Sequence, residues 1–298
     1  MFRLEKSGVP DLARDLIQKY DLTCRLPTIG EFEEYVLNFL KLEENAGLAR
    51  SREENRLAFE RGWSENLEEL KASSPDSYEM ALKPKYYRGS KFFSYDNELV
   101  VTSNLQLEYE LFVIARFCLF HAYLRNVDII VELGCGACAN LLLLSKVLPK
   151  TKLIGLDWTS ASSEIAVELG RRLLKPISGH VFDMLAPDFS LEIPKGAAII
   201  SIHAFEQLGH VFGPALEFIV RSRPSIVMQY EPALEFYDDN RLMDLLALRY
   251  CRRRGYLQGY YSRLLEMERD GKIRILAAYR PYLGGVLHES SVLLWKPA

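Results

Sequence analysis

A short stretch of the chain combines an acidic residue, glycines and cysteines in a spacing that suits ligand binding. Residues 131–146 read VELGCGACANLLLLSK, with Glu132 two positions before Gly134, and with Cys135 between Gly134 and Gly136. Glycines in a turn let the backbone approach a ligand closely, and the first N–H groups of a following helix attract polar groups. The aliphatic run before the turn and the leucine run after it are typical of a strand and a helix. The stretch therefore predicts a nucleotide-type binding turn.

The spacing of the glycines distinguishes between classes of ligand. A dinucleotide-binding turn has the pattern G-x-G-x-x-G, but the last position of that pattern is Ala139. Glu132 would repel a pyrophosphate, whereas a nearby amine or ribose would be favoured. Cys135 and Cys138 have no second Cys or His pair at zinc spacing, so we interpret them as small apolar residues. The turn therefore favours a ligand with an amine or a ribose near Glu132.

The rest of the sequence supplies the elements that would position this turn. After a helical segment that begins near residue 105, five apolar runs alternate with helical patterns: VDIIVELG, KLIGLDW, GHVFDM, GAAIISIHA and PSIVMQYEP. Such runs predict a parallel sheet between two helix layers. The last two runs, KIRILAAYRPYLGG and SSVLLWKPA, leave no room for a crossover helix and should pair antiparallel. We predict an α/β fold, a doubly wound Rossmann-like sheet with an antiparallel last strand.

Residues 1–104 differ from the rest of the chain in composition and in the spacing of their apolar residues. Residues 31–73 carry apolar residues at helical spacing between charged ones, which predicts amphipathic helices. Residues 78–104 are rich in Tyr, Phe and Lys and lack periodicity, which predicts an extended connector of the kind that covers a site. We predict two domains: a mostly helical N-terminal cap with a connector over residues 1–104, and the α/β domain over residues 105–298.

Composition and charge exclude several classes of protein. The 298 residues are 49% hydrophobic and 26% charged with a net charge of -3, which is typical of a globular protein without a nucleic-acid-binding surface. No apolar run reaches the roughly 18 residues that a membrane span needs, and the N-terminus lacks the apolar core of a signal peptide. Five cysteines in a large chain suit the reduced thiols of a cytoplasm. We predict a cytoplasmic protein without nucleic-acid or membrane partners.

The motif and the strand ends together resemble the class I S-adenosylmethionine-dependent methyltransferases. The residues from Glu132 to Cys138 match the family's E/D-x-G-x-G-x-G motif, except that Cys138 stands at the third glycine. The resemblance implies that S-adenosyl-L-methionine is the cofactor and that residues 105–298 form the methyltransferase domain. The turn over residues 134–136 would wrap the methionine part of the cofactor, with Glu132 near its amino group.

The ends of the next two strands fit the same cofactor. Asp157 ends KLIGLDW, where the family places a carboxylate on both ribose hydroxyls, and each carboxylate oxygen can accept a hydrogen bond. A helix N-cap is the alternative role for Asp157. Trp158 follows and is expected to lie against the adenine. Asp183 and Met184 end GHVFDM, where the resemblance implies an acceptor for the adenine amino group and a backbone N–H for the ring.

Catalytic residues are predicted at the rim formed by the later strands. His203 follows the fourth parallel strand, and an imidazole titrates near neutral pH, so we predict it as a general base. Glu231 and His288 are further catalytic candidates, and Glu206 is expected to orient His203 or to bind the substrate. Each could instead be an ordinary hydrogen-bonded core group or a carboxylate at a helix start. His203, Glu206 and Glu231 could be argued into a metal site, but their spacing is not characteristic, and we predict no metal.

An aromatic and basic patch in the connector suits the substrate. Tyr86, Tyr87 and Arg88 lie close to Lys85 and Lys91. Aromatic faces and a cation could cover the cofactor and orient a sugar or an anionic acceptor. Packing of the helical segment against the sheet is the alternative role. We predict Tyr86, Tyr87 and Arg88 as substrate-binding residues.

These features predict a transferase that moves a methyl group from a sulfonium to a nucleophile held beside it in a dry pocket. We predict O-methylation of a saccharide or another small polyhydroxylated metabolite, because SIHAFEQLG and the N-terminal extension loosely resemble sugar O-methyltransferases. The alternatives are N-methylation, O-methylation of a natural-product phenol, an NAD-dependent oxidoreductase, and a non-catalytic cofactor-binding protein. The oligomeric state does not follow from the sequence.

Overall fold

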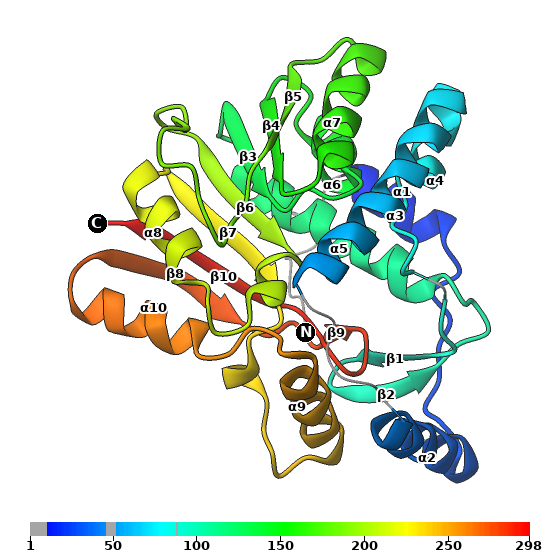
Figure 1. Ribbon diagram of the computed structural model, residues 1–298. Helices are drawn as coiled ribbons and strands as arrows, with labels where there is room; N and C mark the ends of the chain where they lie inside the picture. The colour runs from blue at the N-terminus through cyan, green and yellow to red at the C-terminus, as the bar shows by residue number, and fades with distance from the viewer. Residues whose placement is uncertain (1–10, 46–51, 88) are drawn as a thin grey trace.

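The computed structural model describes residues 11–45, 52–87 and 89–298 and is built around a seven-stranded sheet of order β5-β4-β3-β6-β7-β10-β8 (Figure 1). The parallel strands are β3 (Ile129–Leu133), β4 (Lys152–Asp157), β5 (Ile177–Val181), β6 (Ala198–Ile202) and β7 (Ile226–Glu231). The last strand, β10 (Ser291–Pro297), lies antiparallel between β7 and β8 (Ile273–Tyr279). This topology confirms the predicted doubly wound α/β sheet with an antiparallel last strand.

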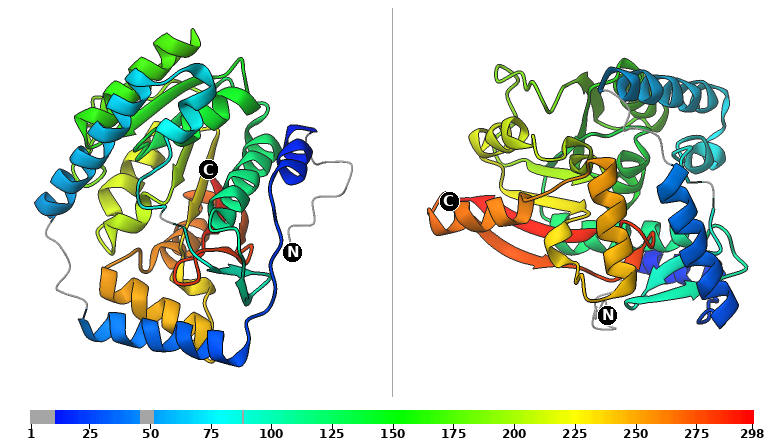
Figure 2. Two further views of the ribbon diagram at one scale, coloured as in Figure 1. Left: turned by 90° about the vertical axis from the view of Figure 1, so that its right-hand side faces the viewer. Right: turned by 60° about the horizontal axis from the view of Figure 1, so that its bottom comes forward.

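Successive residues of the parallel strands face two separate cores. In β6, Ile200 and Ile202 pack on one side of the sheet and Ile199 packs on the other. Helices cover both faces, which explains why inner strands such as β6 are almost entirely apolar. The helices α5 (Leu107–Leu124), α6 (Ala139–Val147) and α7 (Ser160–Leu173) cover the first face, and α8 (Gly213–Ser222) and α10 (Tyr260–Arg269) cover the second (Figures 1 and 2). The carboxyl ends of the parallel strands meet at one edge, where ligands bind in open α/β sheets.

The N-terminal region is mostly helical, as predicted, but its connector also contains a hairpin. The helices are α1 (Asp11–Lys19), α2 (Ile29–Asn45), α3 (Arg52–Ala72) and α4 (Tyr78–Ala81). The strands β1 (Phe92–Tyr95) and β2 (Glu98–Val101) pair antiparallel around a turn in which Asp96 and Asn97 have φ values of 50° and 67°, which these residue types tolerate. A later strand, β9 (Leu283–Gly284), pairs antiparallel with β1. The strand β9, which follows β8, thus completes a sheet whose other two strands belong to the N-terminal region. The predicted domain boundary at residue 104 stays a prediction.

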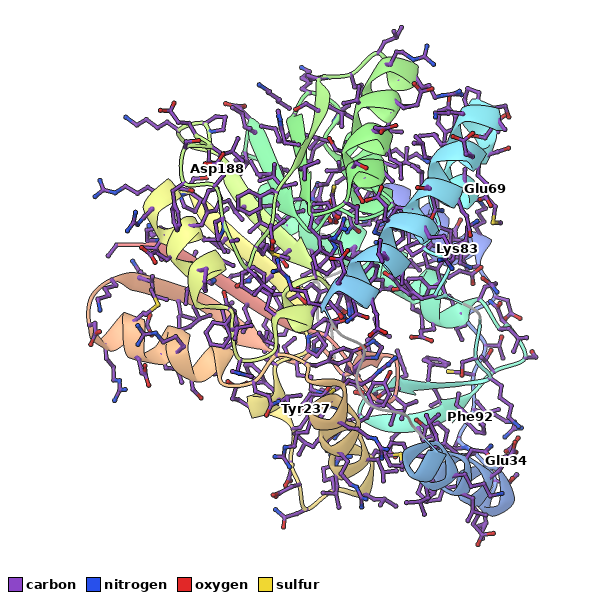
Figure 3. All side chains as sticks on the ribbon, in the orientation of Figure 1. Glu34, Glu69, Lys83, Phe92, Asp188 and Tyr237 are labelled. Carbon is purple, nitrogen blue, oxygen red and sulfur yellow. The ribbon has the colours of Figure 1, made fainter. Side chains whose placement is uncertain are left out.

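Contacts between α2 and the hairpin hold the cap together. The rings of Tyr35 and Phe92 meet edge to face with centroids 5.2 Å apart, and Lys91 Nζ lies 2.9 Å from Glu34 Oε2. Figure 3 shows Glu34 and Phe92 on the same side of the molecule, opposite Asp188. Within the described ranges, no helix is long and apolar enough to cross a membrane.

A carboxylate from α3 caps the N-terminus of α7. Glu60 accepts hydrogen bonds from the backbone N–H groups of Ser160 and Ala161, each at 3.0 Å, and from the hydroxyl of Ser160 at 2.8 Å. These are first-turn N–H groups that have no partner within their own helix. Trp63 on α3 also lies over the glycine turn, because a Cβ atom at Gly136 would come within 3.0 Å of its ring. The two contacts fix α3 across the edge of the sheet.

Removing the Glu60 carboxylate, which caps the N-terminus of α7, should destabilise the protein. We expect Glu60→Ala to lower the free energy of unfolding by about 1 kcal/mol, the usual effect of losing a helix cap. Chemical denaturation measures the change, and Glu65→Ala, at an exposed position of the same helix, serves as the matched control. Equal stabilities for the two variants would show that the cap has no energetic role.

Candidate active site

Two neighbouring cavities lie at the carboxyl edge of the sheet. The strand-end cavity, of about 450 Å³, is lined by the turns after β3, β4 and β5 together with residues of α3 and α5. The cap cavity, of about 860 Å³, is lined by residues of α3 and α5, by residues 85–87, 89, 90 and 92, and by residues 284–288 and 290. Both cavities are lined by Asn55, Phe59, Trp63, Tyr86, Tyr87, Phe112, His203, Gln207 and Arg254. The two cavities are therefore adjacent and share these side chains as a common wall.

At the end of β3, an acid, an amide and a guanidinium form a buried chain. Asn140 Nδ2 donates to Glu132 Oε1 at 2.5 Å, and Arg116 Nη1 donates to Asn140 Oδ1. Asn140 and Arg116 line the strand-end cavity, while Glu132 is fully buried behind them. Among the described residues, Glu132 Oε2 has no hydrogen-bond partner. Glu132 lines neither cavity, so its contact with the amino group of a cofactor stays a prediction, while the guanidinium of Arg116 at the cavity wall suits the carboxylate of a ligand.

The buried carboxyl group of Glu132 makes stability depend on pH. Burial raises its pKa from 4.5 to about 8, against the hydrogen bond from Asn140 and the positive charge of Arg116. The charges of Asp157 and Glu231 add to the rise. Because the folded state holds this proton more tightly than the unfolded chain, the stabilisation is complete below about pH 4.5 and is lost as pH rises through about 8.

We therefore expect the stability of the ligand-free wild type, relative to Glu132→Gln, to fall with increasing pH. One proton limits the slope to about 1.4 kcal/mol per pH unit. Denaturant titrations at several pH values between those two pKa values measure the difference between the two proteins. A difference that stays constant with pH would show that Glu132 is ionised throughout.

The glycine turn has the backbone conformation that its sequence suggests. Gly134 and Gly136 have φ values of 74° and 50°, in the left-handed region that glycine favours. Cys138, at the position of the third motif glycine, also has a positive φ of 59°. Its sulfur lies 3.8 Å from that of Cys135, and both are buried free thiols. Cys135, Gly134 and Gly136 line the strand-end cavity.

Asp157 joins the glycine turn to the start of α7 and lines the strand-end cavity. Its Oδ2 accepts from Gly136 N at 3.0 Å, and its Oδ1 accepts from the N–H and hydroxyl of Thr159 at 3.0 and 2.7 Å. The side chain is buried, and burial raises the pKa of Asp157. A carboxylate has about four acceptor positions, so Oδ2 retains capacity for a further donor such as a ribose hydroxyl.

Trp158, Asp183 and Met184 line the same cavity beyond Asp157. Asp183 Oδ1 accepts from Leu185 N at 2.9 Å, and its Oδ2 pairs with Arg52 of α3. The guanidinium of Arg52 also lies 6.0 Å from the centre of the Trp158 ring. The predicted adenine end is therefore covered by a cation that the sequence analysis did not identify.

His203 lies where the two cavities meet, and other polar side chains surround it. Its Nδ1 lies 3.1 Å from Glu206 Oε2, and its Nε2 lies 2.6 Å from the hydroxyl of Ser290. The ring of His288 is 5.5 Å away, centre to centre. Burial lowers the pKa of His203 to about 4, so the imidazole is neutral at neutral pH. The fold thus brings together His203, Glu206 and His288 from two distant parts of the sequence.

Glu231 ends β7 but lines neither cavity. Its carboxylate accepts from the hydroxyl of Ser201 and from the N–H groups of three successive residues, Ala204, Phe205 and Glu206. It is fully buried and holds the turn that carries His203. This placement corrects the expectation that Glu231 meets the substrate, because its acceptor positions face the protein's own backbone.

Two of the predicted substrate residues, Tyr86 and Tyr87, lie in the wall between the two cavities. Tyr86 and Tyr87 line both cavities, with ring centres 4.8 Å apart, and Glu206 lines the cap cavity. Arg88 lies outside the described residues.

Several lining residues were not identified from the sequence because they lie on helices and not at strand ends. They are Arg52, Asn55, Phe59, Trp63, Phe112 and Arg116. One signal was available, since Arg116 interrupts the apolar run LFVIARFCLFHAYL, and a buried charge requires a partner.

Neither a family model nor a curated protein matches this chain. Solved structures resemble it at low identity. A protein from Pyrococcus horikoshii OT3 has a TM-score of 0.48 and 15% identity, over 65% of this chain and 93% of that one. Geranyl diphosphate methyltransferase in complex with S-adenosylmethionine has a TM-score of 0.46 and 12% identity, over 66% of this chain and 92% of that one. An O-methyltransferase from neocarzinostatin biosynthesis has a TM-score of 0.42 and 13% identity, over 66% and 59% of the two chains.

Proposed function

We propose that this chain is an S-adenosylmethionine-dependent methyltransferase. The observation that carries the proposal is the order of polar groups along the strand-end cavity. Arg116 and Asn140 lie at the end of β3, Asp157 ends β4, and Asp183 follows β5. Because these three strands are neighbours in the sheet, the groups follow one another across its edge. S-adenosylmethionine presents a zwitterionic amino acid, a ribose diol and an adenine in the same order.

The residues present fit this cofactor. The guanidinium of Arg116 suits the carboxylate of the methionine tail, and Glu132, buried behind Asn140, holds that amide at the cavity wall. Asp157 suits the ribose hydroxyls, and the cavity of about 450 Å³ lies in the usual range for ligands of this size. When bound, S-adenosylmethionine supplies an electrophilic methyl group on its sulfonium.

We assign the acceptor to the cap cavity. Its wall alternates aromatic rings such as Tyr109 and Tyr256 with charged side chains such as Glu108 and Arg254. Aromatic faces can pack against the C–H faces of a sugar, while charged groups bind its hydroxyls. These features support a saccharide or another small polyhydroxylated acceptor.

The chain itself contributes mainly by positioning. His203 lines both cavities, so we assign it to the acceptor oxygen that must lie in line with the methyl group. Glu231 and Glu206 hold His203 in place, through the backbone of the turn and through Nδ1 respectively. Holding donor and acceptor together in this way is the largest contribution that a methyltransferase site can make without covalent chemistry. The cytoplasmic location and the lack of nucleic-acid partners remain predictions from composition.

Mass spectrometry of acceptor panels incubated with methyl-labelled S-adenosylmethionine tests the proposal. We expect a labelled methyl group on a saccharide or related polyol. Labelling of phenols or amines in its place would reject the acceptor class and retain the methyltransferase. If S-adenosylhomocysteine binds and no acceptor is labelled, a non-catalytic cofactor-binding protein would be favoured, and calorimetric binding of NADH without S-adenosylhomocysteine would indicate an oxidoreductase.

A further inference from the structure

We propose that His203, Glu206 and His288 form a binding site for a divalent transition-metal ion in the wall of the cap cavity. One ligand atom from each side chain lies within 4.8 Å of the other two. All three side chains line the cap cavity, so an ion between them would keep positions open toward the acceptor. Two imidazoles, one carboxylate and an open position match the ligand set of catalytic zinc sites and suit other first-row divalent ions.

The outer hydrogen bonds of this cluster support the same assignment. Histidine and carboxylate ligands of metals are oriented by partners on the atoms that do not face the ion. The far nitrogen of His203, Nε2, lies 2.6 Å from Ser290 Oγ. The far oxygen of Glu206, Oε1, accepts from Gln207 Nε2 at 3.0 Å. These bonds leave His203 Nδ1 and Glu206 Oε2, which are 3.1 Å apart, facing each other across a gap that an ion could occupy after a small movement.

The charge balance around Glu206 also favours a cation. Its side chain is 5% exposed, and its Oε2 lies 3.1 Å from His203 Nδ1. A buried carboxylate is unfavourable without a positive partner. Arg254 lines both cavities, but it is exposed and its Nε lies 3.3 Å from the hydroxyl of Tyr250. A metal ion between the two histidines would place a positive charge directly beside this buried carboxylate.

The catalytic role of the ion, unlike its binding, rests on the proposed methyltransferase function. An acceptor with two adjacent oxygens could bind the open positions of the ion, which would lower the pKa of a bound hydroxyl. The oxygen lone pair then forms the C–O bond, the C–S bond breaks with its electron pair going to sulfur, and the hydroxyl proton passes to water. Acidification by the ion takes the place of the general base expected at His203. The prediction of no metal rested on sequence spacing, and spacing gives no sign of this cluster because His288 lies far along the chain from His203 and Glu206.

Titration with Co²⁺, followed by visible absorption, tests the site in the full-length chain. We expect the wild type to bind one Co²⁺ in this cluster. Since losing an outer partner alone lowers metal affinity roughly 10- to 100-fold, Ser290→Ala should show an effect of that size. His288→Ala and Glu206→Gln remove a ligand outright and should lower the affinity by at least about 100-fold. His210→Gln, at an exposed position in the same segment as His203, is the matched control and should bind Co²⁺ like the wild type.

S-adenosylhomocysteine binding, measured by calorimetry on the same proteins, separates this inference from the proposed function. Glu206, His288 and Ser290 line the cap cavity and not the strand-end cavity, so their variants should keep the wild-type affinity for that ligand. Co²⁺ affinity that is absent, or equal in the wild type and in His288→Ala, would overturn the metal site even if S-adenosylhomocysteine binds. Loss of Co²⁺ binding in the variants without any S-adenosylhomocysteine binding to the wild type would support the metal site and reject the methyltransferase. Where His288→Ala lacks a cooperative thermal transition, His288→Gln replaces it.

Discussion

The variant His203→Gln is expected to transfer methyl groups at least about 100-fold more slowly than the wild type. The substitution removes the imidazole assigned to the acceptor, which is also a ligand of the proposed metal site, and losing assistance to proton removal usually has at least this effect. His203 lines both cavities and contacts Glu206 and Ser290. The residues assigned to the ribose and the methionine tail, Asp157, Asn140 and Arg116, are unchanged in this variant. The dissociation constant for S-adenosylhomocysteine should therefore stay within about threefold of the wild-type value, so that kcat falls and cofactor binding does not.

The variant His210→Gln is the control for the effect of a His→Gln substitution in this segment. It carries the same substitution in the same segment, at an exposed position outside both cavities. We expect it to turn over at the wild-type rate. If His203→Gln is fully active, or folds normally and loses S-adenosylhomocysteine binding, the assignment of His203 to the acceptor is wrong.

The variant Asp157→Ala should bind S-adenosylhomocysteine less tightly by roughly 1 to 3 kcal/mol, or about 5- to 150-fold in the dissociation constant. The carboxylate has two functions that this change removes together. It is expected to accept from the ribose hydroxyls, and it accepts from Gly136 N and Thr159 N, which orders the glycine turn beside α7. Isothermal titration calorimetry measures the loss.

A control variant separates loss of the ligand contact from general destabilisation. Asp128 is exposed at the start of β3, at the opposite end of the sheet from both cavities. Asp128→Ala should leave the affinity unchanged. Wild-type affinity in a folded Asp157→Ala protein would reject the ribose assignment.

The large sheet could be predicted from the sequence because its signals are local. The inner strands β3 and β6 are buried on both faces, so their own residues form apolar runs, and the glycine turn after β3 marks the end of one of them. The hairpin in the connector was not predicted, because β1 and β2 have four residues each and β1 also pairs with β9, far along the chain. Strand pairing of that kind is fixed by tertiary packing and leaves little periodicity in the sequence.

The candidate site likewise contains residues that local sequence signals predict and residues whose positions depend on tertiary packing. Asp157 and Asp183 could be proposed because the carboxyl ends of parallel strands meet at one edge. Glu231 also ends a strand, yet its side chain bonds to the backbone of the adjacent turn, a choice that strand position does not determine. Trp63 and His288 reach the cavities from a cap helix and from the segment before β10, and their positions depend on how those elements pack.

The crystal structure of the chain grown with S-adenosylhomocysteine tests the central claim most directly. We predict the ligand in the strand-end cavity, with the ribose hydroxyls on Asp157 and the amino-acid tail beside Asn140 and Arg116. A strand-end cavity without ligand at saturating concentration, or a ligand whose ribose lies away from Asp157, would contradict the account.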